Sequence, residues 1–188
     1  MIRVRVCPKA ARELVGSAAF DFYGAERLGQ HLFANCVIAL DIRTGKHIWH
    51  YQIVHHDLWD RDVPAQPNLI TVMHGGKRID AVAQITKHGY VFVLDRETGE
   101  PLFPVEERPV PQSVVGEDKA WPTQPIPLKP SPFTRTELSE AGLSDILPGI
   151  RVYMPSVLAA TNILGGRGRY MGTAPARLCC CRVCSSLT

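Results

Sequence analysis

The 188-residue sequence predicts an all-β fold, and three features lead to that prediction. Between residues 35 and 104, short apolar or alternating segments are separated by turns that contain glycine, as in antiparallel sheets. No helical period of apolar residues is sustained over this part of the chain. A motif also recurs within it, which is typical of proteins built from repeated β units.

The strand candidates follow one another closely and are joined by short turns. They span residues 35–41, 47–52, 68–74, 78–86 and 89–95. Gly45 lies in the loop after the first strand, and Gly75 and Gly76 connect the third strand to the fourth. Because glycine accepts the positive φ that tight hairpins require, we expect antiparallel pairs on both sides of these turns.

The recurring motif is a turn followed by an aromatic residue. Residues 39–49 read ALDIRTGKHIW, and residues 93–103 read VLDRETGEPLF, so Asp, Thr and Gly keep their places. A unit of about 40 to 50 residues made of short strands is typical of a propeller blade. Two unrelated hairpins with common turn chemistry are the alternative. The motif favours a partial β-propeller in which Trp49 is buried against a neighbouring blade.

The chain changes character after Pro101. Prolines recur up to Pro132, so we expect a mostly extended surface connection with little regular structure. Residues 136–147 are compatible with a helical turn or two, and the tail after Gly165 has the composition of a disordered segment.

Four cysteines crowd that tail, at positions 179, 180, 181 and 184. Cys181 and Cys184 form a C-x-x-C pair, which can bind zinc or act in redox chemistry. No second pair of ligands follows it, so we expect free thiols in the tail.

The bulk composition excludes several classes of function. A formal net charge of +3 is too small to indicate nucleic acid or an acidic membrane surface as the partner. No segment reaches the ~18 to 20 apolar residues of a membrane span. The N-terminus has basic residues without an apolar run, so no signal peptide is visible in this chain.

The densest polar cluster is the stretch HHDLWDRD at residues 55–62. Two histidines and three carboxylates in eight residues are typical of a metal site or of general acid–base chemistry. A solvated polar loop between strands is the alternative. The cluster alone does not decide between them.

The order of several motifs is similar to that in the membrane-type quinoprotein glucose dehydrogenases. The motifs are WHYQ at 49–52, HHDLWD at 55–60, PAQP at 64–67, ITKHG at 85–89 and VFVLDRETGE at 91–100. The proline-rich stretches 105–111 and 122–125 match as well, so the resemblance covers about residues 16–133. Residues 39–49 resemble the tryptophan-docking motif that joins neighbouring blades in this superfamily.

The resemblance implies an eight-bladed propeller enzyme dependent on pyrroloquinoline quinone (PQQ). Such an enzyme oxidises a glucose-like sugar or an alcohol by hydride transfer, and a quinone or cytochrome accepts the electrons. By resemblance Asp60 is the catalytic base and lies at a calcium ion, or at another divalent or trivalent cation. Lys87, 27 residues later, would contact the quinone carbonyls, and Asp62 would be a further carboxylate near the metal. The resemblance also implies a periplasmic or periplasm-facing location.

The chain departs from the family at several points. The earlier blade with the metal-binding Glu is absent, and residues 16–24 contain no Asn to complete the cation site. We expect residues 1–15 to lie outside the family segment, residues 16–133 to form the partial propeller, and residues 134–188 to form an irregular or disordered tail. The ends resemble frameshifted sequence. Because the chain lacks these two cation ligands, we expect it to be inactive when expressed alone.

Two other functions stay open beside a quinoprotein dehydrogenase. One is a propeller that serves as a binding scaffold without catalysis, and the other is an inactive, pseudogene-like product. The presence of both Asp60 and Lys87 argues against the scaffold, because a scaffold needs neither.

Overall fold

The computed structural model describes residues 2–5, 10–18, 23–110, 112, 117–134 and 136. Every regular element within these residues is a β-strand. The strands are β1 (Ile2–Arg5), β2 (Ala10–Val15), β3 (Cys36–Asp41), β4 (His47–Gln52), β5 (Asn68–His74), β6 (Lys77–Ile85), β7 (Val91–Asp95), β8 (Val105–Pro109) and β9 (Thr123–Pro127). The predicted all-β class is confirmed. The predictions for residues 137–147 and for the cysteine-rich tail lie outside the described residues.

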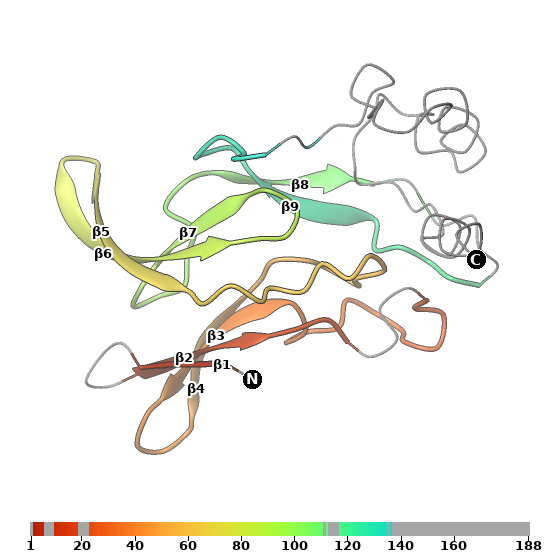
Figure 1. Ribbon diagram of the computed structural model, residues 1–188, viewed down its shortest axis with the longest axis horizontal. Helices are drawn as coiled ribbons and strands as arrows, with labels where there is room; N and C mark the ends of the chain where they lie inside the picture. Colours follow the sequence, from red (N-terminus) through yellow and green to blue (C-terminus); the bar gives the residue numbers. More distant parts are fainter. Residues whose placement is uncertain are drawn as a thin grey trace, which may run out of the picture.

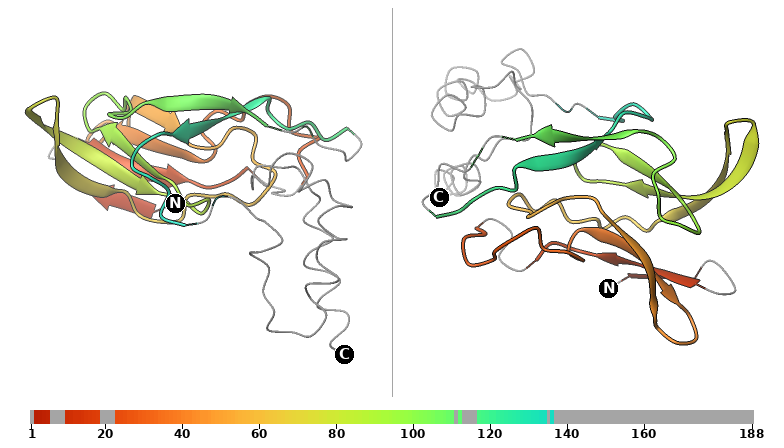
Figure 2. Two further views of the ribbon diagram at one scale, coloured as in Figure 1. Left: turned by 90° about the horizontal axis from the view of Figure 1, so that it is seen from above. Right: turned by 180° about the vertical axis from the view of Figure 1, so that it is seen from behind.

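The strands form three small antiparallel sheets in chain order. Their orders are β1-β2-β3-β4, β5-β6-β7 and β8-β9. The sheet β5–β7 lies between the other two, as seen from the front in Figure 1 and from behind in Figure 2. A succession of small antiparallel sheets is the arrangement expected of a partial propeller. Residues 1–15, predicted to lie outside the family segment, contribute β1 and β2, and β2 pairs with β3 along its whole length.

The predicted strands correspond closely to β3–β7. Two of them, β4 and β5, have the predicted bounds, and the other three differ by one or two residues at an end. The turn glycines adopt the left-handed conformation, with φ of 69° at Gly45, 57° at Gly75 and 75° at Gly76. The hairpins therefore form where glycine relieves the steric cost of positive φ.

The repeated motif is also a structural repeat. We name residues 41–46 the first turn and residues 95–100 the second turn. In both, the Oδ1 atom of the leading aspartate accepts the N–H groups two and three residues later, at 2.7–3.0 Å. In both, the glycine N–H donates to the carbonyl of that aspartate, at 2.8 Å in the first and 3.0 Å in the second. Asp, Thr and Gly recur because each makes the same hydrogen bond in each turn.

The hydrophobic core lies between the sheets. Its buried members come from β3, β4, β6, β7 and β9 and from the connecting loops. They are Val37, Ala39, Trp49, Ile53, Val54, Val63, Val82, Tyr90, Phe92, Leu94 and Ile126. The core therefore joins all three sheets.

Trp49 links the first sheet to the second turn. Only 7% of its surface is exposed, and its Nε1 donates to the Arg96 carbonyl at 3.3 Å. A Cβ on Gly99 would lie 2.5 Å from two atoms of the indole ring, so the ring rests directly on the glycine backbone. The predicted burial of Trp49 against the neighbouring blade is confirmed.

The proline-rich segment holds more regular structure than predicted. β8 and β9 pair antiparallel, and residues 124–127 are buried rather than solvated. The backbone hydrogen bonds at the two ends of this pair run from the Val110 N–H to the Pro122 carbonyl and from the Leu128 N–H to the Pro104 carbonyl. In an antiparallel pair hydrogen-bonded and non-hydrogen-bonded residue pairs alternate, and Pro109, Pro125 and Pro127 fall in the alternate pairs between these two. The prolines thus occupy the pairs that exchange no hydrogen bonds, where a missing N–H costs nothing.

Replacing Trp49 with Ala should lower the free energy of unfolding by about 3 to 5 kcal/mol, because a large buried ring is lost from the core. Urea unfolding followed by far-UV circular dichroism would measure the change. Ile48→Ala is the matched control, since Ile48 is the adjacent strand residue and is 47% exposed. A similar loss in both variants would contradict a docking role for Trp49.

Candidate active site

The polar cluster lies in the loop that connects β4 to β5, residues 53–67. Most of this loop is buried, including His55, His56, Asp57 and Arg61. The alternative of a simple solvated loop is therefore wrong for its first half. In the second half of the loop Trp59, Asp60 and Asp62 are partly exposed, and Pro64 and Gln66 are exposed.

Asp57 organises the loop from inside. It is 2% exposed, and its Oδ1 accepts the Trp59 N–H at 2.9 Å. Its Oδ2 accepts the Arg61 N–H at 2.6 Å, the Asn35 side-chain amide at 3.0 Å and the Ser17 hydroxyl. Both carboxylate oxygens are thus satisfied, and they close the backbone around residue 60 as an Asx turn does.

Asp60 sits at the apex of this turn in an uncommon conformation. Its φ is 54°, the left-handed region that few non-glycine residues adopt. The Asp57 hydrogen bonds to Trp59 and Arg61 flank the residue and hold it there. Such strain persists only when the surroundings fix it, and it is concentrated at functional positions.

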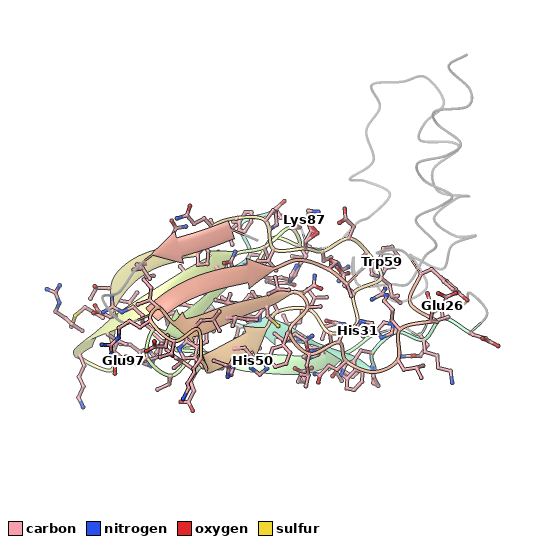
Figure 3. All side chains as sticks on the ribbon, turned by 90° about the horizontal axis from the view of Figure 1, so that it is seen from below. Glu26, His31, His50, Trp59, Lys87 and Glu97 are labelled. Carbon is pink, nitrogen blue, oxygen red and sulfur yellow. The ribbon has the colours of Figure 1, made fainter. Side chains whose placement is uncertain are left out.

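The structure brings together the three residues predicted for the site. Lys87 Nζ donates to the Asp60 carbonyl at 3.0 Å, to Asp60 Oδ2 at 3.2 Å and to Asp62 Oδ2 at 3.2 Å. The side chains of Lys87, Asp60 and Asp62 are 39%, 41% and 31% exposed. Lys87 follows β6, and Figure 3 shows it on the edge of the molecule opposite His50. The group is therefore rigid at its base and open to solvent at its surface.

Burial and the neighbouring charges shift the pKa of Asp60 and the pKa of Lys87. Burial raises the pKa of Asp60; Asp62 raises it further by a hydrogen bond and by its charge, whereas Lys87 lowers it. Burial lowers the pKa of Lys87, but its hydrogen bonds to Asp62 and Asp60 outweigh burial and raise it overall. Lys87 is therefore an ammonium at neutral pH, fixed between two acidic side chains.

Gln124 of β9 fixes the beginning of the loop. Its Oε1 accepts the His55 N–H at 2.9 Å, and its Nε2 donates to the His55 carbonyl at 2.6 Å. One buried amide thus satisfies both backbone groups of a residue that no strand pairs. The proline-rich segment therefore supports the site.

The two histidines pack within the protein and do not join Asp60. The His55 ring lies 2.6 Å from Gln52 Oε1 and 3.1 Å from Glu107 Oε1. His56 Nδ1 donates to the Gly29 carbonyl at 2.7 Å, and its ring stacks on His31. Within the described residues no group of three or more His, Cys, Asp or Glu side chains could hold a metal ion. The histidines are thus structural parts of the loop.

The sequence predicted Asp60, Asp62 and Lys87 as site residues but not the residues that hold them. Asp57 carried one local signal, because the side chain of an aspartate can accept the backbone N–H two residues later and so form an Asx turn. Gln124 carried none, since it meets His55 across 69 residues of sequence.

The sequence profile of the family described as "Glucose/ethanol/alcohol dehydrogenase, beta-propeller domain", which carries the label PQQ, matches residues 14–165. This match covers most of the chain and includes the whole Asp60–Lys87 group. The chain belongs to this family. The quinoprotein dehydrogenases of this family are oxidoreductases that depend on PQQ, and the predicted family and partial propeller are both confirmed.

The chain is similar to several individual proteins over part of its length. The quinoprotein glucose dehydrogenase of Escherichia coli is 43% identical over 113 residues, which are 60% of this chain and 14% of that protein. The glycerol dehydrogenase large subunit of Gluconobacter thailandicus is 34% identical over 154 residues, 80% of this chain and 21% of that protein. Among solved structures, the quinohemoprotein alcohol dehydrogenase from Comamonas testosteroni is 25% identical in sequence. The structural match has a TM-score of 0.49 and covers 64% of this chain and 18% of that one.

The chain therefore spans about one seventh of the glucose dehydrogenase that it matches. No helix within the described residues is long and apolar enough to cross a membrane. The division of the chain at residues 15 and 133 stays a prediction.

The charge group predicts two opposite pKa changes. Lys87→Met should raise the pKa of Asp60 further, because the ammonium that stabilises its ionised form is removed. Asp62→Asn should lower the pKa of Asp60, because a neighbouring negative charge is removed. A carbon-13 NMR titration of the aspartate carboxyl groups would measure both.

Asp80→Asn is the control for this titration, because Asp80 is an exposed carboxylate that pairs with Arg96 instead. That variant should leave the pKa of Asp60 unchanged. Shifts of the same sign in the Lys87 and Asp62 variants would contradict the arrangement.

Proposed function

We propose that this chain is the part of a quinoprotein dehydrogenase that supplies the catalytic base and a quinone contact for oxidation of a sugar or alcohol. The observation that carries the proposal is the convergence of Lys87 Nζ on Asp60 and Asp62. These residues are 27 and 25 positions apart, and they form one exposed charge group in a family of PQQ-dependent enzymes.

Asp60 is the proposed proton acceptor. Oxidation of an alcohol requires the loss of the hydroxyl proton as the C–H bond breaks, and a positioned carboxylate can take it. The left-handed backbone holds the Asp60 side chain at the surface, where a substrate hydroxyl can reach Oδ2. The adjacent Lys87 favours the ionised form that a base must have.

Lys87 is the proposed contact to the cofactor. PQQ, when bound, supplies the hydride acceptor. The ammonium of Lys87 already donates to three oxygens of Asp60 and Asp62, so a hydrogen bond to a cofactor oxygen would replace one of these. Its positive charge would stabilise negative charge on that oxygen. Its partial exposure leaves room for such an oxygen next to Asp60.

Asp60 and Asp62 are the proposed protein ligands of a cation. One Oδ2 atom of each lies 3.2 Å from Lys87 Nζ, so the two oxygens lie side by side around an ammonium, and a cation bound by both would have to take the place of that ammonium or lie beside it. Carboxylate oxygens are the ligands that calcium takes, but calcium needs about 6 to 8 of them. The donor set fits a hard cation, calcium or another divalent or trivalent ion, that draws its other ligands from elsewhere.

The names of two relatives support the proposed substrate class, and the family resemblance supports the proposed partners. We propose a glucose-like sugar or another alcohol as substrate, and a quinone or cytochrome as electron acceptor. We also propose a periplasmic or periplasm-facing location. The support is the similarity to a protein named as a glucose dehydrogenase and to one named as a glycerol dehydrogenase.

The role of Asp60 can be tested in a chimera of the Escherichia coli glucose dehydrogenase that carries the matching segment of this chain. Asp60→Asn keeps the size of the side chain but removes the base, so turnover should fall by about 10² to 10⁴ fold. A dye-linked assay with glucose would measure this rate.

Asp80→Asn in the same chimera is the control, and its turnover should equal that of the unmodified chimera. Full activity of the Asp60→Asn chimera would refute the assignment of the base.

The 188-residue chain alone should not oxidise glucose or other alcohols, even with PQQ and calcium added. Two carboxylates in an open group bind a cation weakly, because affinity depends on ligand number and rigidity. An open site also leaves the cofactor in water, which weakens the field that favours hydride transfer. Saturable, calcium-dependent turnover by the purified chain would show that the site is more local than proposed.

A further inference from the structure

His55 joins the loop of the candidate active site to the proline-rich segment. It is 7% exposed and lies five residues before Asp60. Gln124 of β9 binds its backbone, and its ring lies against Glu107 of β8. Both β8 and β9 therefore hold the start of this loop through one residue.

Gln52 fixes the proton on one ring nitrogen of His55. Its Nε2 lies 2.8–3.2 Å from the backbone carbonyls of Gln30, His31 and Ala34. Carbonyls only accept hydrogen bonds, so the amide nitrogen must face them and Oε1 must face His55. Oε1 lies 2.6 Å from His55 Nδ1, and this oxygen also only accepts. Nδ1 therefore carries a proton.

Glu107 requires a proton on the second ring nitrogen. Its Oε1 lies 3.1 Å from His55 Nε2, and an ionised carboxylate has no hydrogen to donate. A neutral ring with its proton on Nδ1 would bring two acceptors face to face here. The contact is therefore a hydrogen bond only while both nitrogens are protonated and His55 is an imidazolium.

The nearest side chains are compatible with a charged ring. The Gln30 amide lies 2.9 Å from Nδ1 and can turn its oxygen to that N–H. The Trp121 ring contacts the imidazole in a T-shaped arrangement. Glu107 supplies the negative charge that faces the ring.

Other charged or titratable groups lie on the elements around His55. Burial raises the pKa of Tyr51, and the charge of Glu107 raises it further, so the hydroxyl stays neutral. Glu117 and Lys119 are exposed. The remaining groups have hydrogen bonds, ion pairs or ring contacts of their own. They are Arg27, His31, His56, Asp57, Glu106, Arg108 and Asp118.

We propose that His55 and Glu107 are positioning residues, and that their charged hydrogen bond holds the start of the active-site loop on β8 while His55 is protonated. The effect on catalysis rests on the proposed function, because it acts through the position of Asp60. The bond is present at low pH. It is lost as the pH rises through the range in which histidine releases its proton, about pH 5 to 8.

Loss of this bond would loosen the loop without detaching it. Gln124 would still bind the His55 backbone, and Asp57 would still close the turn around Asp60. A small displacement of a positioned base is enough to lower a rate strongly. We therefore expect an effect on turnover rather than on folding.

Nitrogen-15 NMR of the full 188-residue chain tests the bond without any enzyme activity. Both ring nitrogens of His55 should stay protonated to a higher pH in the wild type than in Glu107→Ala, because the carboxylate favours the charged ring. At low pH the backbone N–H of His55, which donates to Gln124, should exchange with solvent about tenfold faster in Glu107→Ala.

Glu107→Gln separates a proton-dependent bond from a packing contact. The glutamine amide can donate from its nitrogen to an unprotonated Nε2, so its hydrogen bond does not need the second ring proton. In the Escherichia coli chimera, turnover of the unmodified protein relative to Glu107→Gln should fall by about tenfold between about pH 5.5 and about pH 8. Glu107→Ala should be slow at both pH values.

Glu106→Gln is the matched control, because Glu106 is the adjacent residue of β8 and pairs with Arg108 instead. It should change neither the ring protonation nor the pH profile. Equal His55 protonation in the wild type and Glu107→Ala would refute the bond. Parallel pH profiles of the unmodified and Glu107→Gln chimeras would refute its role in positioning. The Asp60→Asn chimera tests the base independently, so failure of that assignment gives a different result.

Discussion

The contact between the Trp49 ring and the Gly99 backbone sets the distance between the first two sheets, and the loops that cross between them depend on it. The loop after β4 starts four residues beyond Trp49 and ends where β5 begins. Its apex can meet Lys87, which follows β6 of the second sheet, only if the sheets keep this spacing. A docking contact in the core thus fixes the geometry of a charge group at the surface.

The strands that the sequence predicted well are those whose signals are local. β4 and β5 combine apolar or alternating residues with flanking glycine turns, and neither needs a distant partner to be recognised. β8 and β9 could not be predicted in this way, because the effect of a proline depends on its place in the register. Pro125 and Pro127 are tolerated only because each faces a residue with which it exchanges no hydrogen bond.

The same difference between local and long-range signals decides which parts of the site could be predicted. The residue types in the 55–62 stretch indicated polar chemistry, but the pairing of Asp60 with Lys87 came from resemblance and not from any local pattern. The supporting residues were beyond reach, because Asn35 and Gln124 act through contacts that span 22 and 69 residues. Long-range hydrogen bonds to a loop backbone leave no periodic trace in a sequence, so the charged residues were visible and their support was not.

The left-handed backbone at Asp60 has a consequence for evolution and engineering. Glycine would adopt this φ without steric cost, and asparagine would adopt it more readily than most residues, so either should fit the turn at least as well. Selection for thermal stability alone would therefore accept the loss of the carboxylate at this position. If aspartate is retained at position 60 while mutations accumulate elsewhere, selection has acted on its carboxylate, because the fold by itself does not require an aspartate there.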